Sequence, residues 1–277
     1  MTRHVVDGAA YEVRTSGSGG PPVLLVHGFT GRGADWSPFL PAVHAADHRT
    51  IVVDLLGHGR SDAPGDPARH AIERQAADLH AILRRLEAVP AVVVGYSMGS
   101  RVALYLAVEA PDAVAGLVLA SPSAGIADAG ERTARFAADR ELAGRLEHDG
   151  LEAFLRAWEA NPLFAGEHRL PPRRRETIHR ARARNSVAGL AGSLRGAGQG
   201  AMAALHDRLA TARTPTLVVA GALDPVGAAR AEGVAAALPN ADIVTLARVG
   251  HAPHREAPAA FRRLLIDQLT AWRTATP

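Results

Sequence analysis

Short apolar runs, with helical patterns between them, constrain the fold of this chain most. Six runs rich in β-branched residues recur at 23–26, 51–53, 91–94, 117–119, 216–219 and 243–246. Because they are apolar throughout and do not alternate, they are typical of strands in a parallel sheet covered on both faces. Between two of them, the apolar residues Ile72, Ala76, Leu79, Leu83 and Leu86 recur at helical spacing. The pattern therefore predicts an α/β fold with a mostly parallel, doubly wound sheet.

The strand pattern stops after Leu119 and resumes only at Thr216. The segment between them is rich in Arg, Ala and Leu, and Leu151, Phe154 and Trp158 follow helical spacing. We interpret 124–210 as a helical lid inserted into a core formed by 1–123 and 211–277. Ligands of open α/β sheets bind beyond the carboxyl ends of the strands, so we expect this lid to cover that edge.

Composition excludes several kinds of chemistry. The 277 residues include no Cys and no Lys, and 31 basic against 28 acidic residues give a formal charge of +3. Disulfides, thiolate sites, lysine Schiff bases and a P-loop are thereby excluded. The high isoelectric point reflects the pKa of arginine, so it does not favour nucleic acid as a partner.

No metal, cofactor or membrane span is expected. The chain contains no His-Glu-x-x-His, and the glycine cluster at 196–200 does not follow a strand as a dinucleotide-binding loop would. No stretch approaches the roughly 20 apolar residues that span a bilayer, and the first residues lack the apolar core of a signal peptide. We expect a soluble cytoplasmic protein, and the pattern leaves its oligomeric state open.

A Gly-x-Ser-x-Gly pentapeptide follows the run 91–94 directly. Gly95-Tyr-Ser97-Met-Gly99 precedes a helical pattern that includes Val102 and Leu106. This context is typical of a nucleophile elbow, in which glycines permit a turn that holds the serine hydroxyl at the end of a strand. Ser97 is therefore a candidate catalytic residue.

A serine hydroxyl reacts at neutral pH only when a histidine takes its proton and a carboxylate orients that histidine. Asp224 follows the run 216–219, and His251 follows the run 243–246. The order Ser, Asp, His is that of α/β-hydrolases. His254 is a rival base, whereas Asp54 precedes the elbow and is expected to be structural.

Two backbone amides are candidates for an oxyanion hole. Phe29 follows the first apolar run, and Met98 follows the elbow serine. Such preorganised donors stabilise negative charge that develops during a reaction. We expect the His27 side chain to brace this loop.

Arginines near the elbow favour an anionic ligand. Arg101 lies four residues after Ser97 and shares its helix face. A guanidinium buried there needs either a protein carboxylate or an anion brought by the substrate. The segment 124–210 adds a set of arginines near Trp158 and Tyr96, namely Arg132, Arg135, Arg184 and Arg195.

With these residues in place, the chain resembles the 2-succinyl-6-hydroxy-2,4-cyclohexadiene-1-carboxylate synthases of menaquinone biosynthesis, which have the α/β-hydrolase fold. The resemblance covers core and lid. It rests on Gly95-Tyr-Ser-Met-Gly-Ser-Arg101, Ser121-Pro-Ser-Ala-Gly125, Glu131-Arg-Thr-Ala-Arg135 with Asp139, Trp158 with Pro162-Leu-Phe164, Arg184-Asn185 with Gly189-Leu-Ala191, Ser193-Leu-Arg-Gly196 and Gly250-His-Ala-Pro-His-Arg-Glu256.

The resemblance implies a cofactor-independent lyase. Its substrate would be 2-succinyl-5-enolpyruvyl-6-hydroxy-3-cyclohexene-1-carboxylate, which loses a ring proton and then pyruvate. Ser97, coupled to His251 and Asp224, would act as the base and not as an acylated nucleophile. The resemblance further implies that a small polycarboxylate is bound by Arg101, Arg135 and Arg184, with Tyr96 and Trp158 completing the pocket.

The chain departs from the family pattern at three places. Ser100 replaces a glycine, Pro-Val-Gly follows Asp224 where Lys-Phe is usual, and His206 replaces a tryptophan. Two other functions therefore remain open. One is a serine carboxylesterase or C–C hydrolase for an acidic substrate, and the other is a ligand receptor without turnover.

Overall fold

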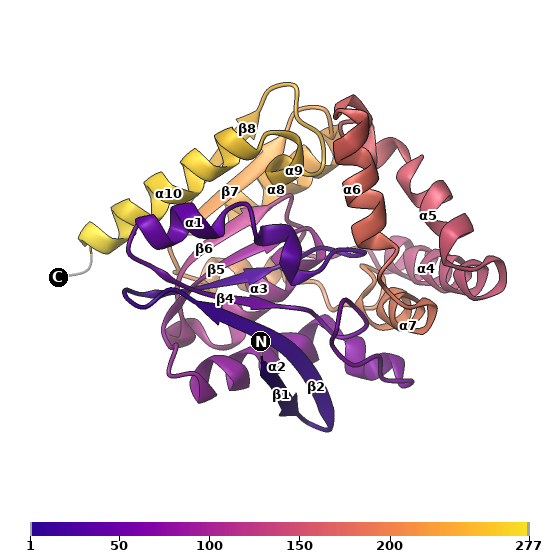
Figure 1. Ribbon diagram of the computed structural model, residues 1–277, viewed down its shortest axis with the longest axis horizontal. Helices are drawn as coiled ribbons and strands as arrows, with labels where there is room; N and C mark the ends of the chain where they lie inside the picture. The colour runs from indigo at the N-terminus through magenta and orange to yellow at the C-terminus, as the bar shows by residue number, and fades with distance from the viewer. Residues whose placement is uncertain (1, 276–277) are drawn as a thin grey trace.

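The computed structural model describes residues 2–275, and its centre is an eight-stranded sheet (Figure 1). The strand order is β1-β2-β4-β3-β5-β6-β7-β8. The first two strands pair antiparallel, β2 also runs antiparallel to β4, and all other neighbours are parallel. The strands are β1 (Thr2–Val6), β2 (Ala9–Ser16), β3 (Pro22–Val26), β4 (Arg49–Val53), β5 (Ala91–Tyr96), β6 (Val114–Ala120), β7 (Thr216–Gly221) and β8 (Ala241–Leu246).

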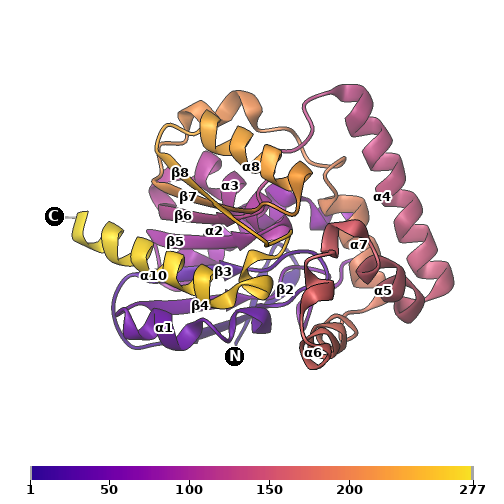
Figure 2. The same ribbon diagram turned by 90° about the horizontal axis from the view of Figure 1, so that it is seen from above.

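Helices cover both faces of this sheet (Figure 2). The α-helices are α1 (Leu40–Ala45), α2 (Ile72–Arg85), α3 (Met98–Glu109), α4 (Ala129–Asp149), α5 (Leu151–Glu159), α6 (Pro172–Arg182), α7 (Val187–Ala197), α8 (Pro225–Ala237), α9 (Pro253–Glu256) and α10 (Pro258–Ala275). Short 3-10 turns are η1 (Gly33–Trp36), η2 (Pro67–His70), η3 (Pro111–Ala113), η4 (Pro162–Phe164), η5 (Glu167–Arg169) and η6 (His206–Thr211).

Apolar clusters pack on both faces of the sheet. On one side, apolar residues of α2 and α3 such as Leu79 and Val102 pack on Val93 of β5. On the other side, Phe261 and Leu265 of α10 pack with Val94 of the same strand. Alternate residues of β5 thus face opposite clusters, which explains why its sequence is apolar throughout. The predicted α/β-hydrolase architecture is confirmed.

Two features of the sheet differ from the sequence prediction. The hairpin of β1 and β2 was missed because polar residues interrupt its sequence, so it has no continuous apolar run. Its turn uses Asp7 and Gly8 at φ of 46° and 75°. The last strand, β8, is a partly exposed edge, with Ile243 38% exposed. The expectation that the last run is covered on both faces was therefore wrong.

Between β6 and β7 the described chain forms helices α4 to α7, which we call the insertion helices. Their own core joins Leu146, Phe154 and Leu190. Figures 1 and 2 show them together at one end of the sheet, where the parallel strands reach their carboxyl ends. The division of the chain into a core and a lid domain, with the boundaries given above, stays a prediction.

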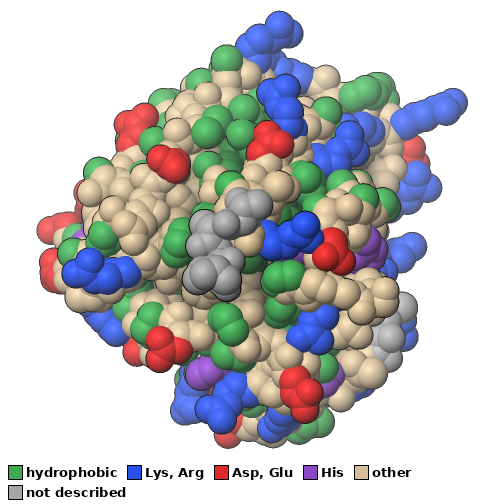
Figure 3. Space-filling model, turned by 90° about the vertical axis from the view of Figure 1, so that its left-hand side faces the viewer, with side chains coloured by type: hydrophobic (Ala, Val, Ile, Leu, Met, Phe, Trp, Pro, Cys, Tyr) green, Lys and Arg blue, Asp and Glu red, His purple; other side chains and the backbone are tan. Residues whose placement is uncertain are grey.

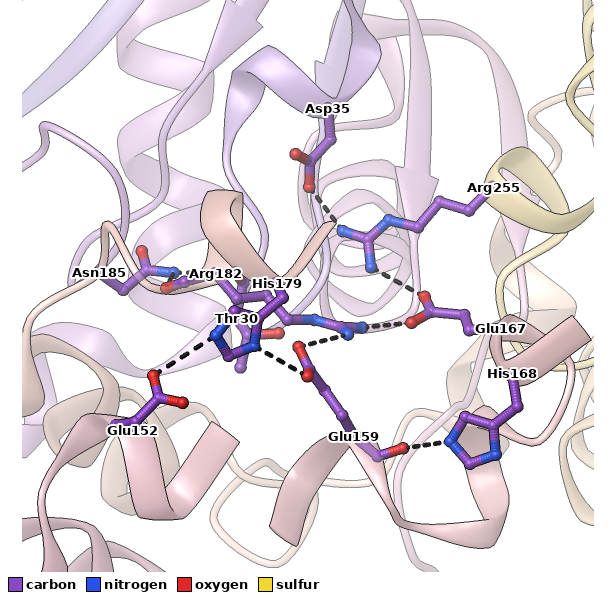
Figure 4. A network of polar contacts seen from close by, with 10 residues as sticks. All are labelled: Thr30, Asp35, Glu152, Glu159, Glu167, His168, His179, Arg182, Asn185 and Arg255. Atoms are coloured by element: carbon purple, nitrogen blue, oxygen red, sulfur yellow. Dashed lines mark hydrogen bonds and ion pairs between the residues drawn. The ribbon is translucent and has the colours of Figure 1, made fainter. Parts of the chain in front are cut away.

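A network of ion pairs connects the insertion helices to the rest of the chain (Figure 4). Arg255 of α9 bonds both Asp35 of η1 and Glu167 of η5, at 2.7 and 3.1 Å. Glu167 also pairs with buried Arg182 of α6, which in turn pairs with Glu159 of α5. Charge pairs in such a buried network hold elements in a specific arrangement, because losing one partner leaves a charge desolvated.

No helix in residues 2–275 is both long and apolar enough to cross a bilayer. On the face shown in Figure 3, basic side chains are interspersed with acidic ones, in keeping with a net charge of only +3.

Candidate active site

The turn between β5 and α3 holds Ser97 in a strained conformation. Its φ of 50° and ψ of −108° lie outside the regions that L-residues favour. The flanking glycines have no room for side chains: a Cβ on Gly99 would lie 2.3 Å from the carbonyl oxygen of Val26, and one on Gly95 would lie 2.5 Å from that of Gly99. The pentapeptide thus forms the sharp elbow predicted from the sequence.

The three residues of the candidate triad lie within hydrogen-bonding distance. His251 Nε2 is 3.0 Å from Ser97 Oγ, and His251 Nδ1 is 2.7 Å from Asp224 Oδ2. Asp224 also accepts a hydrogen bond from the backbone N–H of Gly227 at the start of α8. Burial would raise the pKa of Asp224, but the bonds from His251 and Gly227 and the charge of Arg230 lower it, so the carboxylate stays ionised.

The loop that carries His251 is fixed from both sides. Glu256 accepts hydrogen bonds from the backbone N–H groups of Gly250 and Ala252, at 2.5 and 3.0 Å. Ser121 Oγ donates to the carbonyl oxygen of His251 at 2.9 Å. These bonds orient the imidazole between Ser97 and Asp224.

The rival histidine points elsewhere. The buried His254 ring packs on Tyr96 and Trp36, with centroid distances of 4.3 and 5.0 Å. Burial lowers the pKa of His254 well below its usual value. The geometry therefore favours His251 as the partner of Ser97.

The candidate oxyanion donors flank the elbow. Met98 is the first residue of α3, and Phe29 lies in the loop after β3. Within the described chain, neither backbone N–H has a hydrogen-bond partner, so both are free to bind an oxygen. His27 Nε2 accepts a hydrogen bond from the backbone N–H of Leu55, and Asp54 accepts one from the backbone N–H of Gly33. These bonds agree with the structural roles expected for the two side chains.

Most predicted site residues line one cavity of about 660 Å³ beneath the insertion helices. Its wall includes the triad and the oxyanion pair, together with Tyr96, Arg101, Arg135 and Trp158. The Trp158 ring packs against Phe29 and Phe164, with centroid distances of 5.2 and 5.3 Å. Burial raises the pKa of Tyr96, which stays protonated at neutral pH. The cavity thus combines an aromatic wall with positive charge.

Arg101 is buried without an ion pair. Its side chain donates to the carbonyl oxygen of Ala197 at 2.7 Å, and no carboxylate of residues 2–275 lies within 4 Å of it. Burial and the nearby charges of Arg135 and Arg230 lower its pKa to about 10, so it remains protonated at neutral pH. Of the two partners considered from the sequence, the geometry favours an anion brought by the ligand.

The other predicted arginines differ in their surroundings. Arg135 lines the cavity and pairs with Asp139 at 2.8 Å. Arg184 is exposed and is not part of the cavity wall, because its neighbour Asn185 turns inward to bond Thr30 and Gly59. Arg195 pairs with Glu147, and Arg132 donates to the carbonyl oxygens of Ile126 and Ala127.

Two further arginines of the cavity wall were missed from the sequence. They are Arg145 of α4, which pairs with Glu141, and Arg230 of α8. Arg230 could have been found from its position, since it lies six residues after Asp224 on the helix that Asp224 caps. In the described chain, no three His, Asp, Glu or Cys side chains form a metal-binding group.

Comparison with known proteins identifies the family to which this fold and site belong. A family model described as the alpha/beta hydrolase fold matches residues 21–258. The structure also superposes on "Structure of MenH from S. aureus" with a TM-score of 0.90, at 27% identity over 94% of this chain and 98% of that one. The chain belongs to the α/β-hydrolase fold family.

Within this family, several similar relatives carry the name of one synthase. The chain is 38% identical to a Bacillus subtilis protein named "Putative 2-succinyl-6-hydroxy-2,4-cyclohexadiene-1-carboxylate synthase", over 96% of this chain and 97% of the relative. A 2-succinyl-6-hydroxy-2,4-cyclohexadiene-1-carboxylate synthase from Pectobacterium atrosepticum is 32% identical over 87% of this chain and 90% of the relative. The resemblance inferred from the sequence is confirmed, and the chain is a member of this synthase group of α/β-hydrolase-fold proteins.

Proposed function

We propose that the protein is a lyase that converts 2-succinyl-5-enolpyruvyl-6-hydroxy-3-cyclohexene-1-carboxylate to 2-succinyl-6-hydroxy-2,4-cyclohexadiene-1-carboxylate and pyruvate. One observation carries this proposal: Arg101 is buried, has no ion pair among the described residues, and lies in the same cavity as Ser97, His251 and Asp224. A neutral ester would leave that charge desolvated, whereas a polycarboxylate neutralises it.

The reaction begins with proton removal from the ring carbon that bears the succinyl group. His251 accepts the proton of Ser97, so that the serine oxygen can take the ring proton, and Asp224 stabilises the imidazolium. The electron pair of the broken C–H bond delocalises onto the adjacent ketone oxygen as an enolate. The backbone N–H groups of Phe29 and Met98 are the proposed donors to that oxygen.

Elimination then completes the conversion. The enolate electrons form a new ring double bond, the existing double bond shifts, and the bond from the ring to the enolpyruvyl oxygen breaks. The enolpyruvate leaves with that electron pair and takes up the abstracted proton, which gives pyruvate. No water is added and no bond to the enzyme forms, so Ser97 acts as a base throughout.

The proposal includes binding of the substrate carboxylates by Arg101 and Arg135, with Tyr96 and Trp158 against the ring. Arg184 is exposed and lies outside the cavity wall, so it would have to move to reach the substrate. Its role as a ligand stays a prediction. Location in the cytoplasm likewise stays a prediction, as does the absence of a cofactor.

A paired assay on the full chain separates this function from ester hydrolysis. We expect rapid pyruvate release and diene absorbance from freshly generated substrate, with negligible cleavage of a short aryl ester. Efficient ester cleavage without pyruvate would instead support the carboxylesterase alternative. Tight binding of the substrate without any product would support a receptor.

A further inference from the structure

The charges on the cavity wall do not balance. Four arginines line the cavity: Arg101, Arg135, Arg145 and Arg230. Arg135 and Arg145 have carboxylate partners in Asp139 and Glu141, and the remaining acid of the wall, Asp224, is bonded to His251. Arg101 and Arg230 are therefore the cations of this wall that have no ion pair among the described residues.

Arg230 comes from the core side of the cavity, opposite the insertion helices. It lies on α8, the helix that begins after Asp224, and its charge acts on both Asp224 and Arg101. Its own side chain has no hydrogen bond or ion pair within residues 2–275, and it is exposed. A ligand that reaches this side of the cavity finds an uncommitted guanidinium there.

Apolar side chains lie beside this guanidinium. Val226 precedes Arg230 by one helical turn and so shares its face of α8, and Leu223 lies just before the helix. Both line the cavity, yet they are 60% and 42% exposed. Exposed aliphatic side chains next to a free cation suit a ligand segment that has methylene groups and ends in a carboxylate.

We propose that Arg230 binds the terminal carboxylate of the substrate's succinyl arm, and that Val226 and Leu223 contact the two methylene groups of that arm. This assignment rests on the proposed function. The succinyl arm fits because it is the part of the substrate that joins a short methylene chain to an outer carboxylate. Arg230 is thus a specificity-determining residue that distinguishes a succinyl group from an uncharged acyl group.

Two stable aromatic analogues test the assignment by calorimetry on the full chain. The first, 2-succinylbenzoate, keeps the arm and its carboxylate, whereas 2-butanoylbenzoate ends the arm in a methyl group. For Arg230→Met we expect the dissociation constant of the succinyl compound to rise about 10- to 100-fold, as loss of a charge-assisted hydrogen bond predicts. Binding of the butanoyl compound should not change.

Control variants complete this test. Arg230→Lys keeps the charge and should recover part of the affinity, and Arg262→Met, an exposed arginine of α10, should bind both compounds as wild type does. Equal weakening of both compounds by Arg230→Met, or no weakening of either, would overturn the assignment. So would an absence of binding of the succinyl compound to the wild type.

Kinetics separates failure of this inference from failure of the proposed function. If wild type releases pyruvate and Arg230→Met leaves its KM unchanged, the lyase stands and the role of Arg230 is wrong. If Arg230→Met raises KM with little change in kcat, the result supports an Arg230 that binds the arm equally well in the ground state and in the transition state. If wild type releases no pyruvate, the proposed function fails, and the role of Arg230 as an anchor for the succinyl arm fails with it.

Discussion

At the scale of single residues, Arg101 restricts the chemistry of the ligand most, because its charge is buried and has no carboxylate partner within residues 2–275. Its guanidinium donates to Ala197 and lies near the further positive charges of Arg135 and Arg230. A protein tolerates such a group when a bound anion completes its environment. Burial of the Arg101 guanidinium costs free energy in the protein without ligand. The same burial therefore favours a ligand with several carboxylates.

Replacing Arg101 by Met should weaken transition-state binding. We expect kcat/KM for pyruvate release to fall by the equivalent of about 2–4 kcal/mol, because a buried charge-assisted contact is lost while the volume is roughly kept. Arg156→Met is the control, since that exposed arginine pairs with Glu152 on the surface of α5. Unchanged kinetics in Arg101→Met would contradict the polycarboxylate site.

A local motif and the order of the chain indicated the candidate triad, whose residues the structure brings within hydrogen-bonding distance. Ser97 was found from its pentapeptide, and Asp224 and His251 from their places after strands. Arg184, which stays a predicted ligand, lies in the turn after α6 and is not part of the cavity wall. Arg230 was missed because the direction of a helical side chain depends on how its helix packs. That packing is a tertiary property, which spacing along one helix does not determine.

At the scale of elements, the elbow between β5 and α3 and the sheet beneath it place the site. Strands β3 to β7 were predicted because buried strands read as continuous apolar runs. The hairpin of β1 and β2 was missed because polar residues interrupt its sequence, although the Asp7-Gly8 turn was a usable signal.

Gly99→Ala tests the packing of the elbow. Its Cβ would lie 2.3 and 2.5 Å from the backbone carbonyl oxygens of Val26 and His27, so the strand or the helix must shift. We expect a loss of about 1–3 kcal/mol in the free energy of unfolding, measured by urea titration, and a large loss of activity. In contrast, Gly144→Ala in α4 meets nothing within 4 Å and should stabilise the protein by up to about 1 kcal/mol. Equal stability of the two variants would show that the elbow can adapt.

At the scale of the whole molecule, the network around Glu167 connects three segments that are distant in sequence. Glu167 is buried, which by itself would raise its pKa, but the charges of Arg255 and Arg182 lower it below its usual 4.5. The folded state thus binds the Glu167 proton more weakly than the unfolded state does. The resulting stability is present above about pH 4.5 and is lost as the pH falls further.

Glu167→Gln should remove this contribution. At pH 7 we expect a loss of about 3 kcal/mol in the free energy of unfolding, because Arg182 and Arg255 each lose a buried partner. The difference from wild type should shrink when urea titrations are repeated below pH 4.5, because proton binding by Glu167 then favours the unfolded state. The exposed pair of Glu141 and Arg145 supplies the control, and Glu141→Gln should cost less than about 1 kcal/mol. A difference that does not depend on pH would contradict this account of the network.

The most direct test of the central claim is a single-turnover experiment with excess enzyme on the enolpyruvyl substrate. For wild type we predict diene and pyruvate in equal amounts, with no mass added to the protein at any time. For Ser97→Ala we predict that both products form at least about 10³-fold more slowly, because the general base is lost. Products formed by Ser97→Ala at the wild-type rate, or a covalent adduct on Ser97 in the wild type, would contradict a serine that acts as a base.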